Sequence, residues 1–154
     1  MKKNKGFTLI ELLIVVVIIG IIAAIAIPNM LVAIQKGKQK ATMGDIRNLG
    51  NAVSTYMLDK GICPTNALDS TQLTNFYLQK LVTVDAWGQQ YVYVRGGAGD
   101  DEYSVTSYGK DKAAGGPASA SPGVTEYDVS ELPDFNNDII YSNGVFTWGP
   151  KTRN

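Results

Sequence analysis

Histidine is absent from the 154 residues of this sequence, and cysteine occurs once. The chain therefore lacks the commonest general base of enzymes, and one cysteine forms neither an internal disulfide nor a Cys-x-x-Cys zinc site. Basic and acidic residues balance at 14 each, which argues against a nucleic-acid partner. The sequence has no phosphate-binding glycine loop, and no spacing of hydroxyls and carboxylates indicates a catalytic set. We therefore expect a protein that is not an enzyme.

The distribution of residue types predicts one modest domain behind an apolar N-terminal stretch. About 125 residues remain without that stretch, enough for a single small core. Tyr and Trp are rare before Tyr77 and frequent after it, which favours helix in the first half and strands in the second. We expect the lone Cys63 to be a small buried side chain, with an intermolecular or reactive thiol as the alternative.

Charge is almost missing from residues 7–28, where Glu11 is the only ionisable side chain. These 22 residues make a helix of about 33 Å, which matches the apolar core of a bilayer. Lysines occur before the run and not again until Lys36, so we expect the N-terminus in the cytoplasm.

Two ordinary interpretations of this run compete. One is a secretory signal peptide with Ala24 and Ala26 at its cleavage site, but its apolar region is longer than such peptides use. The other is a plain signal anchor. Neither explains Glu11, because a carboxylate within a spanning helix costs about 3 kcal/mol at the helix centre and usually has a partner.

The segment Gly6-Phe7-Thr8-Leu9-Ile10-Glu11 resembles the class III signal of type IV pilins and type II secretion pseudopilins. The resemblance implies that a prepilin peptidase cuts after Gly6 and methylates the new N-terminus, Phe7. It also implies that Glu11 pairs with the terminal amine of a neighbouring subunit. Such an amine is a cation at neutral pH, and a carboxylate one helical turn along a staggered neighbour compensates it.

The same resemblance implies a location and a set of partners. The chain would be a single-pass protein of the bacterial inner membrane, with its head in the periplasm, or outside the cell if it belongs to a surface pilus. It would form a homopolymer through its N-terminal helices and meet the lipid bilayer, the prepilin peptidase, minor pseudopilins and an inner-membrane assembly platform. No nucleic-acid partner is expected.

The helical pattern continues beyond the membrane run. We expect one helix over about 7–60, whose half at 7–28 spans the membrane and whose half at 29–60 is amphipathic, after a leader at 1–6. Pro28 predicts a kink or local unwinding near Ala24 to Ile27, with a boundary at the membrane surface as the alternative. One apolar stripe recurs at helical spacing: Ile46, Leu49, Val53, Tyr56 and Met57. Gly61 predicts the end of the helix.

Residues 61–154 form the expected head. We predict a short helix over Gln72 to Gln79, strands over Gln90 to Arg95 and Glu102 to Ser107, and a last hairpin in Ile139 to Trp148 that turns at Ser142-Asn143-Gly144. A small antiparallel sheet packed on the long helix gives an α+β, pilin-like fold.

The tract VDAWGQQYVYV resembles the DPWG-x-x-Y-x-Y tract of the major pseudopilin of type II secretion, with Ala86 in place of the usual proline. In that family a nearby loop binds calcium through carboxylates and backbone carbonyls. The corresponding oxygen donors here are Asp111, Asn136, Asn137 and Asp138. Lys110 and Lys112 flank Asp111, and two asparagines stand where aspartates are usual, so a solvated loop with Asx turns remains the alternative.

Four functions follow from these patterns. The favoured one is a major pseudopilin whose filament acts as a periplasmic piston in protein secretion. The alternative is a subunit of a surface type IV pilus used in adhesion, motility or DNA uptake, although pilins more often carry a disulfide-bounded loop. A membrane-anchored enzyme lacks the residues for catalysis, and an electron-conducting filament would need more aromatics along the helix than Phe7 and Tyr56.

Overall fold

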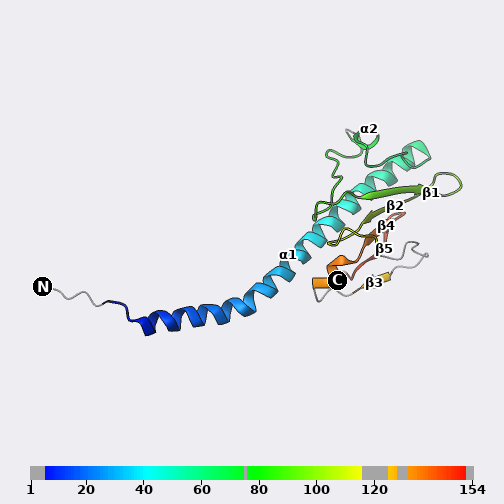
Figure 1. Cartoon of the computed structure of the whole chain (residues 1–154). Coiled ribbons are helices and arrows are strands. Elements are labelled where there is room, and N and C mark those ends of the chain that lie inside the picture. The colour runs from blue at the N-terminus through cyan, green and yellow to red at the C-terminus, as the bar shows by residue number, and fades with distance from the viewer. Residues whose placement is uncertain (1–5, 75, 116–124, 128–131, 152–154) are drawn as a thin grey trace.

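The computed structural model describes residues 6–74, 76–115, 125–127 and 132–151. A long helix projects from a small head, and the head packs on the C-terminal half of that helix (Figure 1). The predicted α+β, pilin-like fold is confirmed.

The helix α1 spans Leu9–Lys60, 52 residues, or about 78 Å at the usual rise per residue. Thr8 caps its N-terminus, and Gly61 ends it in the left-handed conformation with φ of 78°. A glycine suits that cap because it has no Cβ to clash. The predicted C-terminal stop at Gly61 is therefore confirmed.

Pro28 lies inside α1, which stays helical through Ala24 to Ile27. The predicted local unwinding is therefore wrong, because the loss of one N–H is accommodated within a continuous helix. The helix does bend, since its blue N-terminal half and its cyan C-terminal half run in different directions (Figure 1). A bend without a break is one way in which a helix tolerates a proline.

The predicted apolar stripe of α1 forms the seam between helix and head. Ile46, Leu49 and Val53 are buried, and Tyr56 and Met57 pack against the same core. The sheet contributes Tyr91, Tyr103, Val105, Ile139 and Tyr141 to that core. Burial of this stripe on the sheet fixes the head to one side of α1.

The sheet has five strands in the order β1-β2-β4-β5-β3. Their bounds are β1 Val92–Gly96, β2 Glu102–Ser107, β3 Thr125–Tyr127, β4 Ile139–Ser142 and β5 Val145–Pro150. Strands β1, β2, β4 and β5 pair antiparallel, as predicted. The Asn143-Gly144 turn between β4 and β5 has positive φ at both residues. The edge strand β3 pairs parallel to β5 and was not predicted, because it is only three residues long.

The helix predicted over Gln72 to Gln79 is wrong in extent. The structure has a four-residue helix α2, Ser70–Leu73, and later a 3-10 turn η1, Leu132–Asn136. After α2, the carbonyl of Leu73 accepts the N–H groups of both Tyr77 and Leu78, so the chain closes one wide turn there. Leu73 itself is fully buried, and this anchor favours a turn over a longer surface helix.

Candidate functional site

The first candidate site is the start of α1, where Thr8 and Glu11 bind each other. The carboxylate Oε2 of Glu11 accepts the backbone N–H of Thr8 at 2.8 Å and the Thr8 hydroxyl at 2.7 Å. In return, the Thr8 hydroxyl oxygen accepts the N–H of Glu11 at 3.3 Å. This reciprocal capping box satisfies a carboxylate that otherwise stands alone in an apolar segment.

Gly6 and Phe7 precede this box outside the helix. Apart from its chain neighbours, no described residue has an atom within 4 Å of the position where a Cβ would stand on Gly6, and Phe7 is 82% exposed. The peptide bond between them is therefore sterically open, as the entry of a chain into a protease cleft requires.

The apolar half of α1 is uncovered. From Leu9 to Leu31 its large apolar side chains are about half exposed or more, because no described part of the head reaches them (Figure 1). By length and composition this is the one helix among the described residues that could cross a membrane, and none of its most apolar window is buried. A signal sequence passes the same test, so the exposed face by itself does not decide the function.

The tract at residues 84–94 ties the head to α1 through Asp85, which is 5% exposed. The Asp85 carboxylate accepts the N–H groups of Trp87 and Gln89, both at 2.9 Å, and the hydroxyl of Ser107 at 2.7 Å. The Trp87 indole donates to Gln35 of α1 at 2.7 Å, and the Ala86 N–H donates to Thr42 at 3.2 Å. The tract is thus a structural fastener between sheet and helix.

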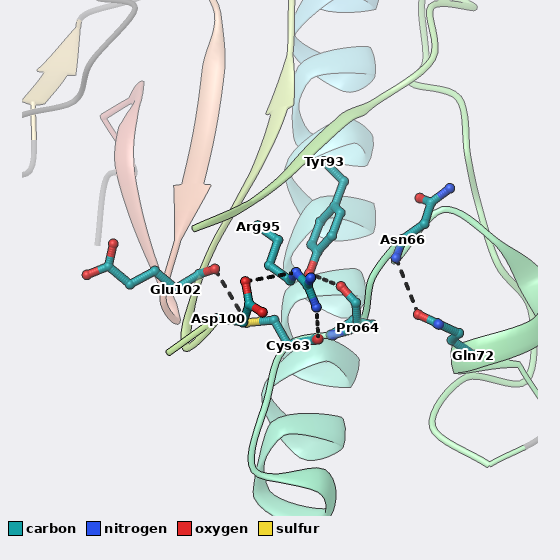
Figure 2. Close-up of polar contacts among 8 residues, drawn as sticks. All are labelled: Cys63, Pro64, Asn66, Gln72, Tyr93, Arg95, Asp100 and Glu102. Carbon is teal, nitrogen blue, oxygen red and sulfur yellow. Dashed lines mark hydrogen bonds and ion pairs between the residues drawn. The ribbon is translucent and has the colours of Figure 1, made fainter. Parts of the chain in front are cut away.

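The segment after α1 is held against β1 and the β1–β2 turn (Figure 2). Arg95 donates to the carbonyl of Cys63 at 3.3 Å and forms an ion pair with Asp100 at 3.3 Å. The Tyr93 hydroxyl donates to the carbonyl of Pro64 at 2.9 Å. Cys63 is 1% exposed, as predicted, and burial raises the pKa of its thiol, so the reactive thiolate is disfavoured.

The predicted metal ligands come from two segments that the fold brings together. The N–H of Lys110 donates to the carbonyl of Phe135 at 2.9 Å. The carbonyl oxygens of Phe135 and Asn137 both lie 2.7 Å from the place where a Cβ would stand on Gly109. Gly109 also has φ of 68°, so both the close approach and the left-handed backbone require glycine at this position.

The donors in this loop are oxygens, the atoms that calcium prefers, but carboxylates are few. Asp138 is 3% exposed, and its carboxylate accepts the N–H of Gly115 at 3.2 Å. Asp111 is exposed and accepts the N–H of Ala113 at 3.1 Å, which is the Asx turn of the alternative interpretation. No group of three or more His, Cys, Asp or Glu residues that suits a metal occurs in the part of the chain that the structure describes. The chemistry of the donors fits a weak calcium site, and the site stays a prediction.

Comparison with known proteins matches two consecutive segments of the chain to known families. Residues 1–27 match the family described as the prokaryotic N-terminal methylation motif, and residues 29–122 match type II secretion system protein G. The chain belongs to the type II secretion system protein G family.

Three curated relatives in the protein G family match over three quarters or more of their own length. The type II secretion system core protein G of Vibrio cholerae is 37% identical over 110 residues, which are 63% of this chain and 75% of the relative. The protein of the same name from Pseudomonas aeruginosa is 33% identical over 71% of this chain and 88% of its own length. The protein from Escherichia coli is 32% identical over 73% of this chain and 86% of its own length. The predicted family resemblance is thus confirmed.

The sequence analysis singled out Gly6, Phe7 and Glu11 for processing and assembly, which stays a prediction, but missed the role of Thr8 as the cap of α1. The signal was present, because Thr followed three residues later by Glu before an apolar run is the pattern of a capping box.

Proposed function

We propose that this protein is the major pseudopilin of a type II secretion system, a structural subunit whose N-terminal helices pack into a periplasmic filament. Membership of the protein G family supports this role. The observation that carries the assembly step is the long exposed apolar half of α1. In the membrane this face contacts lipid, and in a filament it contacts the same face of other copies.

Processing is the first step of the proposed route. A prepilin peptidase cuts between Gly6 and Phe7, removes six residues and methylates Phe7. Before cleavage the lysines of residues 1–6 hold the N-terminus in the cytoplasm, and the head lies in the periplasm. The match of residues 1–27 to the methylation motif supports this step.

Glu11 acts after processing. Its carboxylate moves from its own Thr8 to the terminal amine of a neighbouring subunit in the filament. The exchange replaces two neutral donors with a cation, so it is favourable where the apolar surroundings exclude water. The minor pseudopilins and the inner-membrane assembly platform are the further partners that we propose.

The test of the assembly role is Glu11→Ala in the full chain, produced in a bacterium that has the peptidase and the secretion machinery. We expect normal membrane insertion, normal cleavage by intact mass, and almost no sheared filament. Glu11→Asp should recover part of the yield. Asp69→Asn is the matched control, since it removes an exposed head carboxylate but keeps an acceptor for the N–H of Thr71.

Filaments from Glu11→Ala at the wild-type yield would refute the pairing. Intact masses that show cleavage near Ala26, or no cleavage, would refute the processing step. Deletion of the gene distinguishes the surface-pilus alternative, because loss of protein secretion supports a pseudopilin and loss of surface pili supports a pilin.

We also propose calcium as a weak ligand of the loop around Asp111 and Asp138, with Asn136 and Asn137 as further oxygen donors. When bound, calcium would supply only positive charge and coordination, which tie the two ends of the loop. The family resemblance and the buried Asp138 carboxylate support this assignment.

A further inference from the structure

The middle of α1 carries a basic face beside the apolar half. Lys36, Lys40 and Arg47 are exposed, and their spacing of four and seven residues places them within about 40° of one another around the helix. Asp45 is the only acidic residue of α1 between Glu11 and Asp59, and it lies about 180° from Lys36. We call Lys36, Lys40 and Arg47 the basic stripe.

The basic stripe has no acidic partner of its own. Among the described residues, no carboxylate lies within ion-pair distance of any of its three side chains. The Arg47 guanidinium instead lies 5.3 Å from the centre of the Phe146 ring, a contact that keeps one face of the guanidinium against the head. Gly37 and Gly44 lie beside the stripe and have nothing within 4 Å of their Cβ positions, so the surface there is open to close approach.

The opposite charge gathers on the turn between β1 and β2. Asp100 and Asp101 of this turn are followed by Glu102, the first residue of β2, and within the described part of the chain the ion pair of these three carboxylates is that of Asp100 with Arg95. Asp101 and Glu102 are exposed, and the Glu102 side chain points away from Arg95 and Cys63 (Figure 2). We call Asp101 and Glu102 the acidic turn.

The two charged surfaces cannot meet within one chain. The N–H of Cys63 donates to the carbonyl of Asp100 at 2.8 Å, which holds the acidic turn level with the C-terminal end of α1. Arg47 lies about 20 Å below that end along the helix axis, and Lys36 lies about 36 Å below it. Only another molecule can bring a basic stripe to the height of this turn.

We propose that the acidic turn of one subunit docks on the basic stripe of a second copy of this chain, displaced by about 30 Å along parallel α1 axes. This proposal rests on the proposed filament, which supplies parallel staggered copies. Complementary charge gives the contact its register, because a different stagger would leave both surfaces unpaired.

A lipid surface fits the basic stripe less well. The stripe runs along the helix axis for about 16 Å, so a membrane at the level of Pro28 faces only its Lys36 end. A turn carried by a parallel neighbour can face the middle of the stripe. The stripe also continues directly from the exposed apolar half of α1, which is the helix-packing surface of the proposed filament.

Cysteine crosslinking tests the contact without changing its charge balance much. Lys40→Cys and Asp101→Cys are introduced together in the full chain, and Cys63 stays as a buried internal control. Mild oxidation of assembled filaments should give a ladder of disulfide-linked dimers and longer oligomers. Each single variant should give monomers, and absence of the ladder from filaments of the double variant would overturn the proposal.

Charge exchange tests the energetics. Lys36→Glu with Lys40→Glu, and separately Asp101→Lys with Glu102→Lys, should each lower the yield of sheared filaments about tenfold, because like charges then face each other. Combining all four changes should restore most of the yield. If only the lysine changes lower the yield and the combination stays low, the stripe binds something else, such as lipid headgroups, and the pairing is wrong.

These outcomes separate the contact from the proposed function. If the wild-type chain forms no filament, the proposed function fails. If the wild type and all charge variants form filaments equally well, the filament stands and the docking contact is wrong. Equal thermal melting of the variants in detergent shows that a lost filament is not a lost fold.

Discussion

Gly50 shows how much a single residue decides where the sheet meets α1. A Cβ added at Gly50 would overlap the Tyr141 ring of β4, and the carbonyl of Gly50 accepts the Tyr103 hydroxyl of β2 at 2.9 Å. The absence of a side chain therefore lets two core tyrosines reach the helix backbone. Helix propensity alone disfavours glycine here, so the packing must repay that cost.

We expect Gly50→Ala to lower the free energy of unfolding by about 1–3 kcal/mol, because the new methyl forces the Tyr141 ring out of place. Gly44→Ala is the matched control. Its Cβ meets nothing within 4 Å, so it should stabilise the helix by up to about 1 kcal/mol. Urea unfolding of the full chain in detergent, followed by near-ultraviolet circular dichroism, measures both. Equal shifts in the two variants would contradict this role for Gly50.

Single residues were predictable from the sequence to very different degrees. Gly61 was correctly predicted as the helix end because a glycine follows the last residue of the apolar pattern. Glu11 was singled out because a charge in an apolar run is conspicuous, and its role in assembly stays a prediction. The role of Gly50 was not predicted, since nothing local shows that Tyr141, 91 residues later in the chain, packs there. The spacing of residue types along the sequence does not show which distant segments of the chain contact each other.

At the scale of secondary structure, α1 and the hairpins were predictable, whereas α2 and β3 were not. Glu102–Ser107 alternates exposed and buried residues, and the Asn143-Gly144 turn has its own conformational signature, so local sequence was sufficient. The short elements depend on tertiary contacts. The segment after Ser70 is set by the burial of Leu73, and Thr125–Tyr127 is a strand because β5 offers it an edge.

The Asp85 fastener is an arrangement of elements that the sequence did not reveal. The tract was recognised by its family resemblance, but the pairing of Asp85 with Ser107 and of Trp87 with Gln35 joins a loop, a strand and a helix. Asp85 completes this set by accepting three hydrogen bonds while almost fully buried.

We expect Asp85→Ala to lower the free energy of unfolding by about 3 kcal/mol, because it leaves buried N–H and O–H donors without their acceptor. Asp69→Ala is the comparison, since Asp69 is exposed and accepts the single N–H of Thr71 at the start of the four-residue helix α2, so its loss should cost about 1 kcal/mol or less. Denaturant unfolding of the two variants side by side measures the difference. Similar losses would mean that the fastener contributes little.

At the scale of the whole molecule, the long helix α1 and the head have different roles. The N-terminal half of α1 exposes the apolar face that we propose packs against other copies, and the head provides one folded body on the distal half of α1 (Figure 1). The predicted calcium loop lies at the edge of the head, where Gly109 brings residues 108–111 against residues 135–138. An ion there would tie these two segments to each other, so it should act on the stability of the entire head.

Calcium should therefore raise the melting temperature of the full chain in detergent. At the dissociation constants of extracellular modules, about 10⁻⁴–10⁻³ M, millimolar calcium adds about 0.4–1.4 kcal/mol to the free energy of unfolding, a shift of a few degrees. Magnesium should add less, because it sheds its water reluctantly. Asp111→Ala and Asp138→Asn should each abolish the increment over EGTA, and the asparagine keeps an acceptor for the N–H of Gly115. If wild type and both variants melt alike in calcium and EGTA, the calcium site is absent and hydrogen bonds alone hold this loop. The Asx turn in which Asp111 accepts the N–H of Ala113 is one such hydrogen bond.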